Sequence, residues 1–286
     1  MEIDMLANSE EEKMKFWKSL IPEIKEGLQK YSITDRFLEV HECEAEEIIS
    51  YSRNPIIPAI IIGEEEKVEI ITKGDRVYPF TFWIQSIVTV PLSQIAMRQY
   101  DLVRRCIDKV TFTLCLKEDT LFTNLVEESI KLHKHCMKFN IFDKILGLFI
   151  KGRFLDILGK SISKISNAKY LVLSTILALK LETILYKHGS ESALKDFKEG
   201  KLFGLDIIKI SEIEIEDSFV EGNKTIFSKA LYIFPEEKIG HKAVRCPLTS
   251  VLADQFVFGK AQYGALFEIL ESMTITKTDS IYKIII

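Results

Sequence analysis

The chain has 286 residues, 47% of them apolar, which suffices for one large domain or two ordinary ones and excludes a globally disordered protein. Its 38 basic and 42 acidic residues are interspersed and give a net charge of −4, which excludes a general attraction to nucleic acid. The five cysteines are odd in number and scattered, so we expect reduced thiols in a cytoplasmic product. The N-terminus lacks the order of a signal peptide and no apolar run is long enough to span a bilayer, so we expect no membrane partner.

The first predicted helix follows the run from Ser9 to Glu12, which has the spacing of a capping box. Apolar side chains then share one face of the helix, and Pro22 should kink it or split it in two. These apolar residues are Trp17, Leu20 or Ile21, Ile24 and Leu28. Two interpretations are open: a short amphipathic arm that needs another surface to lie on, or the first helix of an ordinary globular core.

A long β-hairpin is predicted next. Residues 36–40 and 60–62 have short strand patterns, and residues 67–71 and 77–90 form two longer extended runs. The turn between these two runs is Lys73, Gly74, Asp75 and Arg76. Since a two-stranded ribbon is only marginally stable by itself, we expect the hairpin to pack on another subunit or domain.

The central feature is an amphipathic run from Leu92 to Lys117. Its apolar residues recur at steps of three, four or seven, which predicts one buried stripe on a helix about 40 Å long. The stripe consists of Ile95, Leu102, Cys106, Val110 and Leu114. Ser93 can cap the first turn, whereas residues 110–116 are rich in β-formers and could instead form a strand. The charged run 117–120 is predicted to break the helix before a second amphipathic stretch, residues 121–132.

The rest of the chain mixes helices with many strands. Residues 142–165 should form two short helices interrupted by glycines, and Ser174 or Thr175 should cap a helix that ends near His188. A turn is predicted at residues 200–204. Strands are predicted at 169–173, 205–210, 225–234, 243–250, 255–257, 265–270 and 282–286. This order predicts an α+β fold and not a doubly wound sheet.

The search for catalytic or metal-binding motifs gives little. His133, His135 and Cys136 are the densest group of potential metal ligands, but histidines two apart on a helix point to different faces. Glu118 and Asp119 are better explained as a helix cap or as salt-bridge partners than as a catalytic pair. No phosphate-binding loop or nucleophile elbow occurs. We therefore predict no enzyme, cofactor or metal site; an enzyme, if present, would use Glu118, Asp119, His133 or His135.

The order and spacing of several short motifs resemble major capsid proteins of tailed phages and archaeal tailed viruses. The motifs are Arg76-Val-Tyr-Pro-Phe-Thr-Phe82, Ile87-Val-Thr-Val-Pro-Leu-Ser-Gln-Ile95, Arg98 to Arg105, Glu118-Asp-Thr-Leu-Phe122, Tyr170-Leu-Val-Leu173, Gly200-Lys-Leu-Phe-Gly-Leu-Asp-Ile207, Phe267-Glu-Ile269 and Ile281-Tyr-Lys-Ile284. In that family a hairpin, the E-loop, precedes a long spine helix and an acidic break. The resemblance covers the chain from about residue 65 to its end.

The resemblance implies the Hong Kong phage 97 capsid fold. Its parts would be an N-terminal arm at 1–62, the E-loop at 63–92, a peripheral domain at 93–139 and 241–286, and an axial domain at 140–240. The residues expected to act in assembly are those of the hairpin turn and the spine face: Lys73, Gly74, Asp75, Arg76, Leu102, Cys106 and Val110. A protruding ribbon, an arm and an over-long helix each leave surface that one subunit cannot bury, and a closed shell of repeated subunits would cover it.

The implied function is self-assembly through pentamers and hexamers into an icosahedral shell around viral DNA, without catalysis. The location would be the virion, with assembly in the host cytoplasm. Only about 60 residues precede the hairpin, so we expect a separate scaffold protein, together with protease and portal proteins, and DNA packaged without sequence-specific contact. The alternative is an encapsulin nanocompartment shell that holds a protein cargo, because the segment around Trp17 also looks like an encapsulin N-terminus.

Overall fold

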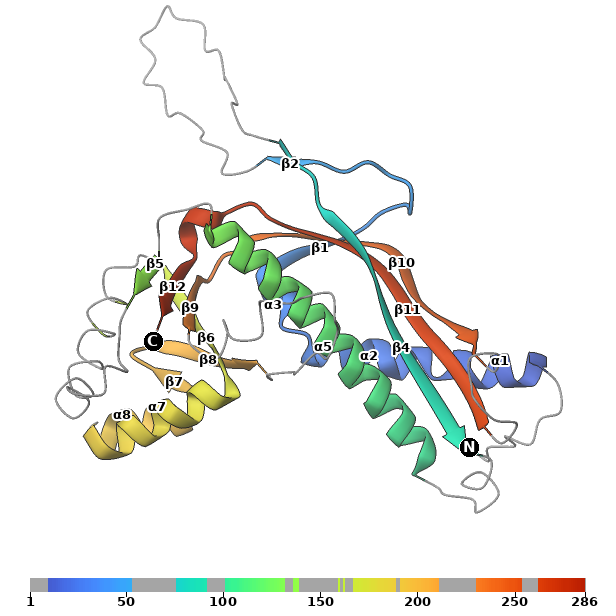
Figure 1. Ribbon diagram of the computed structural model, residues 1–286, viewed down its shortest axis with the longest axis horizontal. Coiled ribbons are helices and arrows are strands. Elements are labelled where there is room, and N and C mark those ends of the chain that lie inside the picture. The colour runs from blue at the N-terminus through green and yellow to red at the C-terminus, as the bar shows by residue number, and fades with distance from the viewer. Residues whose placement is uncertain are drawn as a thin grey trace, which may run out of the picture. The chain divides into compact units, whose positions relative to one another are not determined.

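The computed structural model of the chain forms two compact units, drawn in Figure 1. Unit 1 comprises residues 1–125 and 240–276, and unit 2 comprises residues 126–239 and 277–286. The structure describes residues 10–52, 76–91, 101–131, 136–138, 159, 162, 167–188, 191–210, 230–253 and 262–285. Each unit has its own β-sheet and its own buried apolar cluster.

Unit 1 contains a four-stranded sheet in the order β1-β10-β11-β4. Its strands are β1 (Leu38–Glu42), β4 (Phe80–Pro91), β10 (Gly240–Leu252) and β11 (Gln262–Ile275). β1 runs parallel to β10, and the other pairs are antiparallel. The β10–β11 register shifts on either side of Cys246, next to Pro247, which has no N–H to donate to the ladder.

The second strand of the predicted hairpin is part of this sheet. β4 pairs with β11 from Phe80, opposite Met273, to Pro91, opposite Gln262. The hairpin was expected to pack on another subunit or domain. Its second strand takes its backbone hydrogen bonds from β11, a strand some 180 residues later in the same chain, and its first strand lies outside the described residues. A short sheet of β2 (Tyr51–Ser52) and β3 (Arg76–Val77) lies at the start of the same segment.

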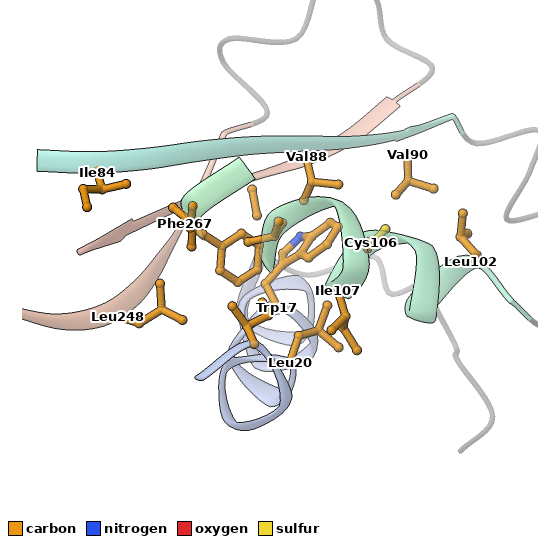
Figure 2. Packing of buried hydrophobic residues seen from close by; sticks show 14 residues of the cluster. Trp17, Leu20, Ile84, Val88, Val90, Leu102, Cys106, Ile107, Leu248 and Phe267 are labelled. Atoms are coloured by element: carbon orange, nitrogen blue, oxygen red, sulfur yellow. The ribbon is translucent and has the colours of Figure 1, made fainter. Parts of the chain in front are cut away.

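The sheet of unit 1 packs its inner face on helices α1 (Glu10–Ser19), α2 (Ile21–Tyr31) and α5 (Leu102–Lys131). Trp17 is buried against Phe267 with the two rings edge to face, as Figure 2 shows. Pro22 stands in the first turn of α2, which explains the predicted split of the N-terminal helix. Of the two interpretations left open, the structure supports an ordinary core, since Trp17, Leu20 and Ile24 are buried in unit 1.

α5 is one uninterrupted helix of 30 residues, about 45 Å long. The predicted stripe is confirmed where it is described, because Leu102, Cys106, Val110 and Leu114 are all buried. The predicted break at residues 117–120 and the alternative strand at 110–116 are both wrong. Within this stretch the threonine hydroxyl of Thr113 bonds back into the helix: its Oγ1 donates to the Lys109 carbonyl at 2.8 Å. The predicted start at Ser93 lies outside the described residues.

Unit 2 contains a six-stranded sheet in the order β5-β12-β9-β6-β8-β7, with helices α7 (Thr175–His188) and α8 (Glu191–Lys198). The strands are β5 (Cys136–Lys138), β6 (Ala168–Ser174), β7 (Lys201–Leu202), β8 (Leu205–Ile210), β9 (Ala230–Pro235) and β12 (Tyr282–Ile285). The predicted cap of α7 is confirmed, because the Leu177 N–H donates to Ser174 Oγ at 3.2 Å. The turn between β7 and β8 uses Gly204, whose positive φ of 82° favours glycine.

The C-terminal strand closes unit 2. β12 lies between β5 and β9, and Ile284 is buried, as expected of a chain that ends in isoleucines. Glu127 of α5 accepts hydrogen bonds from the Tyr232 hydroxyl and from Lys283, so the helix is tied to β9 and β12. These buried polar contacts fix the last strand to the rest of the unit.

Several predicted elements begin at other residues than expected, and others lie outside the described residues. The strand expected at 36–40 starts two residues later, because α3 (Thr34–Phe37) precedes β1. The strands predicted at 60–62, 67–71 and 255–257, and most of the glycine-interrupted helices at 142–165, lie outside the described residues. The compact units differ from the predicted domains, since residues 277–286 belong with unit 2 and not with 241–276. In the part of the chain that is described, no helix is both long and apolar enough to cross a membrane.

Candidate functional site

The solvent face of β4 is the first candidate for a functional surface. Side chains alternate along β4, so Ile84, Val88 and Val90 enter the core of unit 1. Trp83 and Ile87 lie on the opposite face and are 52% and 51% exposed. Within the described sheet β4 is also an edge strand. Large apolar side chains on an exposed edge are typical of a surface that another chain covers.

Two more large side chains are exposed nearby. Tyr78, before β4, and Phe80, its first residue, are both more than half exposed, but Phe80 projects to the same side of the strand as Ile84. Polar pairs hold the same region to β11: Thr81 Oγ1 lies 2.8 Å from Ser272 Oγ, and Gln85 Nε2 donates to Glu268 at 3.0 Å. We define the β4 face as Trp83 and Ile87. It presents two large apolar side chains from a strand that is itself held firmly to the subunit.

The predicted assembly residues fall into two groups in the structure. Leu102, Cys106 and Val110 are buried in unit 1, so they act in the fold of the subunit, and an effect on assembly would pass through that fold. Arg76 is exposed in β3. Lys73, Gly74 and Asp75 lie outside the described residues. Sequence reasoning missed Trp83 and Ile87 as surface residues, although their odd-numbered positions oppose the apolar even positions of the same strand.

A buried ionic cluster forms the second notable site. Lys242 of β10 has a side chain that is only 6% exposed, and its ammonium contacts three carboxylates. The distances from Nζ are 2.6 Å to Glu118, 2.8 Å to Asp35 and 3.2 Å to Glu271. We call these four residues the Lys242 cluster. It joins α3, α5, β10 and β11, so it crosslinks four elements of unit 1.

The predicted role of Glu118 and Asp119 as salt-bridge or cap residues is confirmed. Asp119 Oδ1 accepts from the Ile33 N–H at 3.1 Å and from Thr34 Oγ1 at 3.4 Å, at the start of α3. Ser32 Oγ donates to Glu118 at 3.1 Å. These contacts satisfy donors that the N-terminus of a helix leaves free. They give the acidic pair a structural role; His133 and His135 lie outside the described residues.

The charges in the cluster do not balance, because three carboxylates surround one ammonium. Burial by itself would lower the pKa of Lys242, but Glu118, Glu271 and Asp35 raise it above its usual value. Burial and the charge of Glu118 raise the pKa of Glu271. Burial, followed by the charge of Glu118, raises the pKa of Asp119 to about 7. Glu271 and Asp119 therefore hold a proton up to a higher pH than exposed carboxyls do.

This electrostatic imbalance predicts that the protein is more stable at pH 5 than at pH 8. The pKa of the Asp119 carboxyl is about 7 in the folded state, compared with about 4 in the unfolded state. The protonated carboxyl therefore contributes its full stabilisation below about pH 4, and this contribution is lost as the pH rises to about 7. At about 1.4 kcal/mol per unit of pKa shift, Asp119 would contribute at most about 4 kcal/mol across this range.

Asp119→Asn keeps the acceptor for the Ile33 N–H and removes the titration. We expect urea unfolding to show a shallower fall of stability with pH in this variant than in the native chain. Glu128→Gln, an exposed position on the same helix, is the matched control and should retain the native pH profile. Identical profiles for Asp119→Asn and the native chain would show that Asp119 is ionised in the folded state.

No family model matches the chain, and no curated protein matches it. Solved structures match almost its whole length, phage capsids among them. The mature capsid of bacteriophage PhiM1 aligns with a TM-score of 0.56 at 9% identity, over 89% of this chain and 86% of that one. The capsid of cyanophage P-SCSP1u gives 0.54 at 11% identity, over 89% and 88%. The chain thus has the Hong Kong phage 97 type capsid fold that the resemblance implied.

A virus-like particle from Pyrococcus furiosus is similar over a still larger share of the chain. It aligns with a TM-score of 0.52 at 15% identity, over 93% of this chain and 98% of that one. At such identities the likeness is one of fold. It confirms the α+β class predicted from the order of elements, including the long helix after an extended strand.

Proposed function

We propose that the chain is a major capsid protein that self-assembles through pentamers and hexamers into an icosahedral shell enclosing viral DNA. The observation that carries the proposal is a capsid fold spanning 89% to 93% of the chain. A fold alone does not specify a function, so the proposal also needs a surface that fits it. The β4 face supplies one, because Trp83 and Ile87 are exposed on the second strand of the predicted E-loop.

Assembly would bury the β4 face against a neighbouring subunit. Fully burying a large apolar side chain contributes roughly 1.5–3 kcal/mol, and Trp83 and Ile87 are each about half exposed, so covering both would contribute roughly 1.5–3 kcal/mol per contact. Such contacts repeat in every subunit of a symmetric shell, which makes modest contacts sufficient for a stable particle. The 30-residue α5 and the paired β4 provide a rigid support for this surface.

The proposed location is the virion, with assembly in the host cytoplasm. Its proposed partners are other copies of the chain, separate scaffold, protease and portal proteins, and packaged DNA. The net charge of −4 supports DNA contacts that are weak and independent of sequence, since a container should not bind its contents tightly. No catalytic step is part of the proposal.

Sedimentation velocity of the purified chain, with and without the candidate scaffold protein, tests the proposal. We expect pentamers, hexamers or closed particles. Nuclease-protected DNA inside the particles would support the viral function, and a co-purifying protein in place of DNA would show a nanocompartment. A strictly monomeric chain under all assembly conditions would contradict self-assembly.

The β4 face gives a prediction that separates assembly from folding. Trp83→Lys with Ile87→Lys should abolish closed particles, because two charges would have to be buried without partners at the subunit contact. The free energy of unfolding of the protomer should change by no more than about 0.5 kcal/mol, as is usual for exposed positions. Particle counts by electron microscopy, beside urea unfolding, measure both effects.

The matched control is Trp83→Phe with Ile87→Leu, which keeps the β4 face apolar. We expect this variant to assemble. Normal particles from the double lysine variant would show that the β4 face is not a subunit contact. An unfolded protomer would show that the two side chains belong to the core.

A further inference from the structure

Three potential metal ligands meet on the sheet of unit 1. Glu39 and His41 are two residues apart on β1, so their side chains project from the same side of the strand. His241 of β10 lies directly opposite Glu39 in the parallel register. The next residue along β10, Lys242, projects to the other side and belongs to the buried ionic cluster.

The distances between the ligand atoms fit one metal ion. His41 Nε2 lies 3.2 Å from His241 Nδ1, and Glu39 Oε2 lies 3.4 Å from His241 Nδ1 and 3.8 Å from His41 Nε2. Zn²⁺ binds imidazole nitrogen and carboxylate oxygen at about 2.0–2.2 Å, so neighbouring ligands of a tetrahedral ion lie about 3.3–3.5 Å apart. In an octahedral site the same bond lengths would give about 3.0 Å. The observed separations are closer to the tetrahedral value.

Tyr51 holds part of this arrangement. Its ring stacks on His241 with centroids 4.1 Å apart and an angle of 5° between the planes. His41 stacks on His241 at 5.5 Å. Such packing limits ring rotation and keeps the two nitrogens aimed at a common point, as a metal site needs.

We propose that Glu39, His41 and His241 bind Zn²⁺. The three side chains are 57%, 40% and 25% exposed, so the ion would be reached from solvent and would keep its fourth position for water. The metal would link the edge strand β1 to β10, two segments some 200 residues apart in sequence. It should therefore stabilise unit 1, because an ion that binds only the folded state raises the free energy of unfolding by RT ln(1 + L/Kd), where L is the free ion concentration.

Equilibrium dialysis of the full chain against Zn²⁺, with metal analysis of the protein, tests the site. We expect one site whose affinity falls by more than about 10- to 100-fold in His41→Gln with His241→Gln, because loss of a ligand should exceed the effect usual for groups outside the coordination shell. Glu39→Gln should weaken binding in the same way, and Glu42→Gln on the same strand should not. Added Zn²⁺ should raise the melting temperature of the native chain and not that of the double variant.

The control for the other histidine group in the sequence is His133→Gln with His135→Gln. Zinc binding that is lost in this variant and retained without His41 and His241 would overturn the proposal. So would an absence of stoichiometric binding to the native chain, which would mean that the two imidazoles form a plain hydrogen bond. The substituted side chains are partly exposed, so each metal-free variant should melt close to the native chain, and this measurement excludes a folding defect.

Discussion

Val110→Asp should remove most of the stability of unit 1 and yield insoluble or unassembled protein. Val110 is 0% exposed and lies on the α5 stripe, in the cluster that contains Trp17, Leu114 and Phe267. A carboxylate there would be buried without a partner, in addition to the loss of apolar burial. We expect a loss of about 4 kcal/mol or more in the free energy of unfolding, which exceeds the effect of most single substitutions.

Phe112→Asp is the matched control for this change. Phe112 lies on the same helix but is 60% exposed, so the same charge should change protomer stability by about 0.5 kcal/mol or less. Urea unfolding and the soluble fraction after expression measure the difference. Equal stability of the two aspartate variants would mean that α5 presents a different face to the sheet.

Lys242→Met should be the second strongly destabilising change. It removes the ammonium that contacts Asp35, Glu118 and Glu271 and leaves the buried carboxyls of Glu118 and Glu271 without this partner. Removing one partner of a buried ion pair costs about 3–5 kcal/mol, so we expect the free energy of unfolding to fall by about that amount near pH 8. Because burial and the charge of Glu118 raise the pKa of Glu271, this carboxyl takes up a proton as pH falls toward 5, and the loss should shrink.

The control for Lys242→Met is Lys277→Met. Lys277 also pairs with a glutamate, at 2.7 Å from Glu237, but both side chains are exposed to solvent. Removing this pair should leave stability almost unchanged at either pH. If Lys242→Met were as stable as the native chain at both pH values, the Lys242 ammonium would contribute little to the free energy of unfolding.

Helix α5 shows which features of a helix the spacing of apolar residues predicts and which it does not. The stripe through Leu102, Cys106 and Val110 was visible in the sequence because burial on one side of a helix repeats with the helical period. The predicted break at 117–120 was wrong for a tertiary reason. Glu118 and Asp119 look like a polar interruption, but their partners, Ser32, Ile33 and Lys242, are 86 to 124 residues away. A local pattern contains no information on such partners.

The strands show the same limit. The extended pattern of residues 77–90 predicted β4, yet its pairing with β11 depends on residues some 180 positions later. The proposed zinc ligands could not be recognised from the sequence pattern, because His41 and His241 are 200 residues apart. They become neighbours only through the register of β1 and β10. Of the proposed assembly surface, the hairpin was predicted, whereas Trp83 and Ile87 were identified only when the buried face of β4 was known.

Electron cryo-microscopy of the purified chain, co-expressed with its scaffold where one is needed, tests the capsid function most directly. We predict closed icosahedral particles built from pentamers and hexamers, in which the β4 face, Trp83 and Ile87 included, is covered by a neighbouring subunit. A monomer or a small discrete oligomer under every assembly condition would contradict the proposed function, and closed particles with the β4 face open to solvent would contradict the proposed contact.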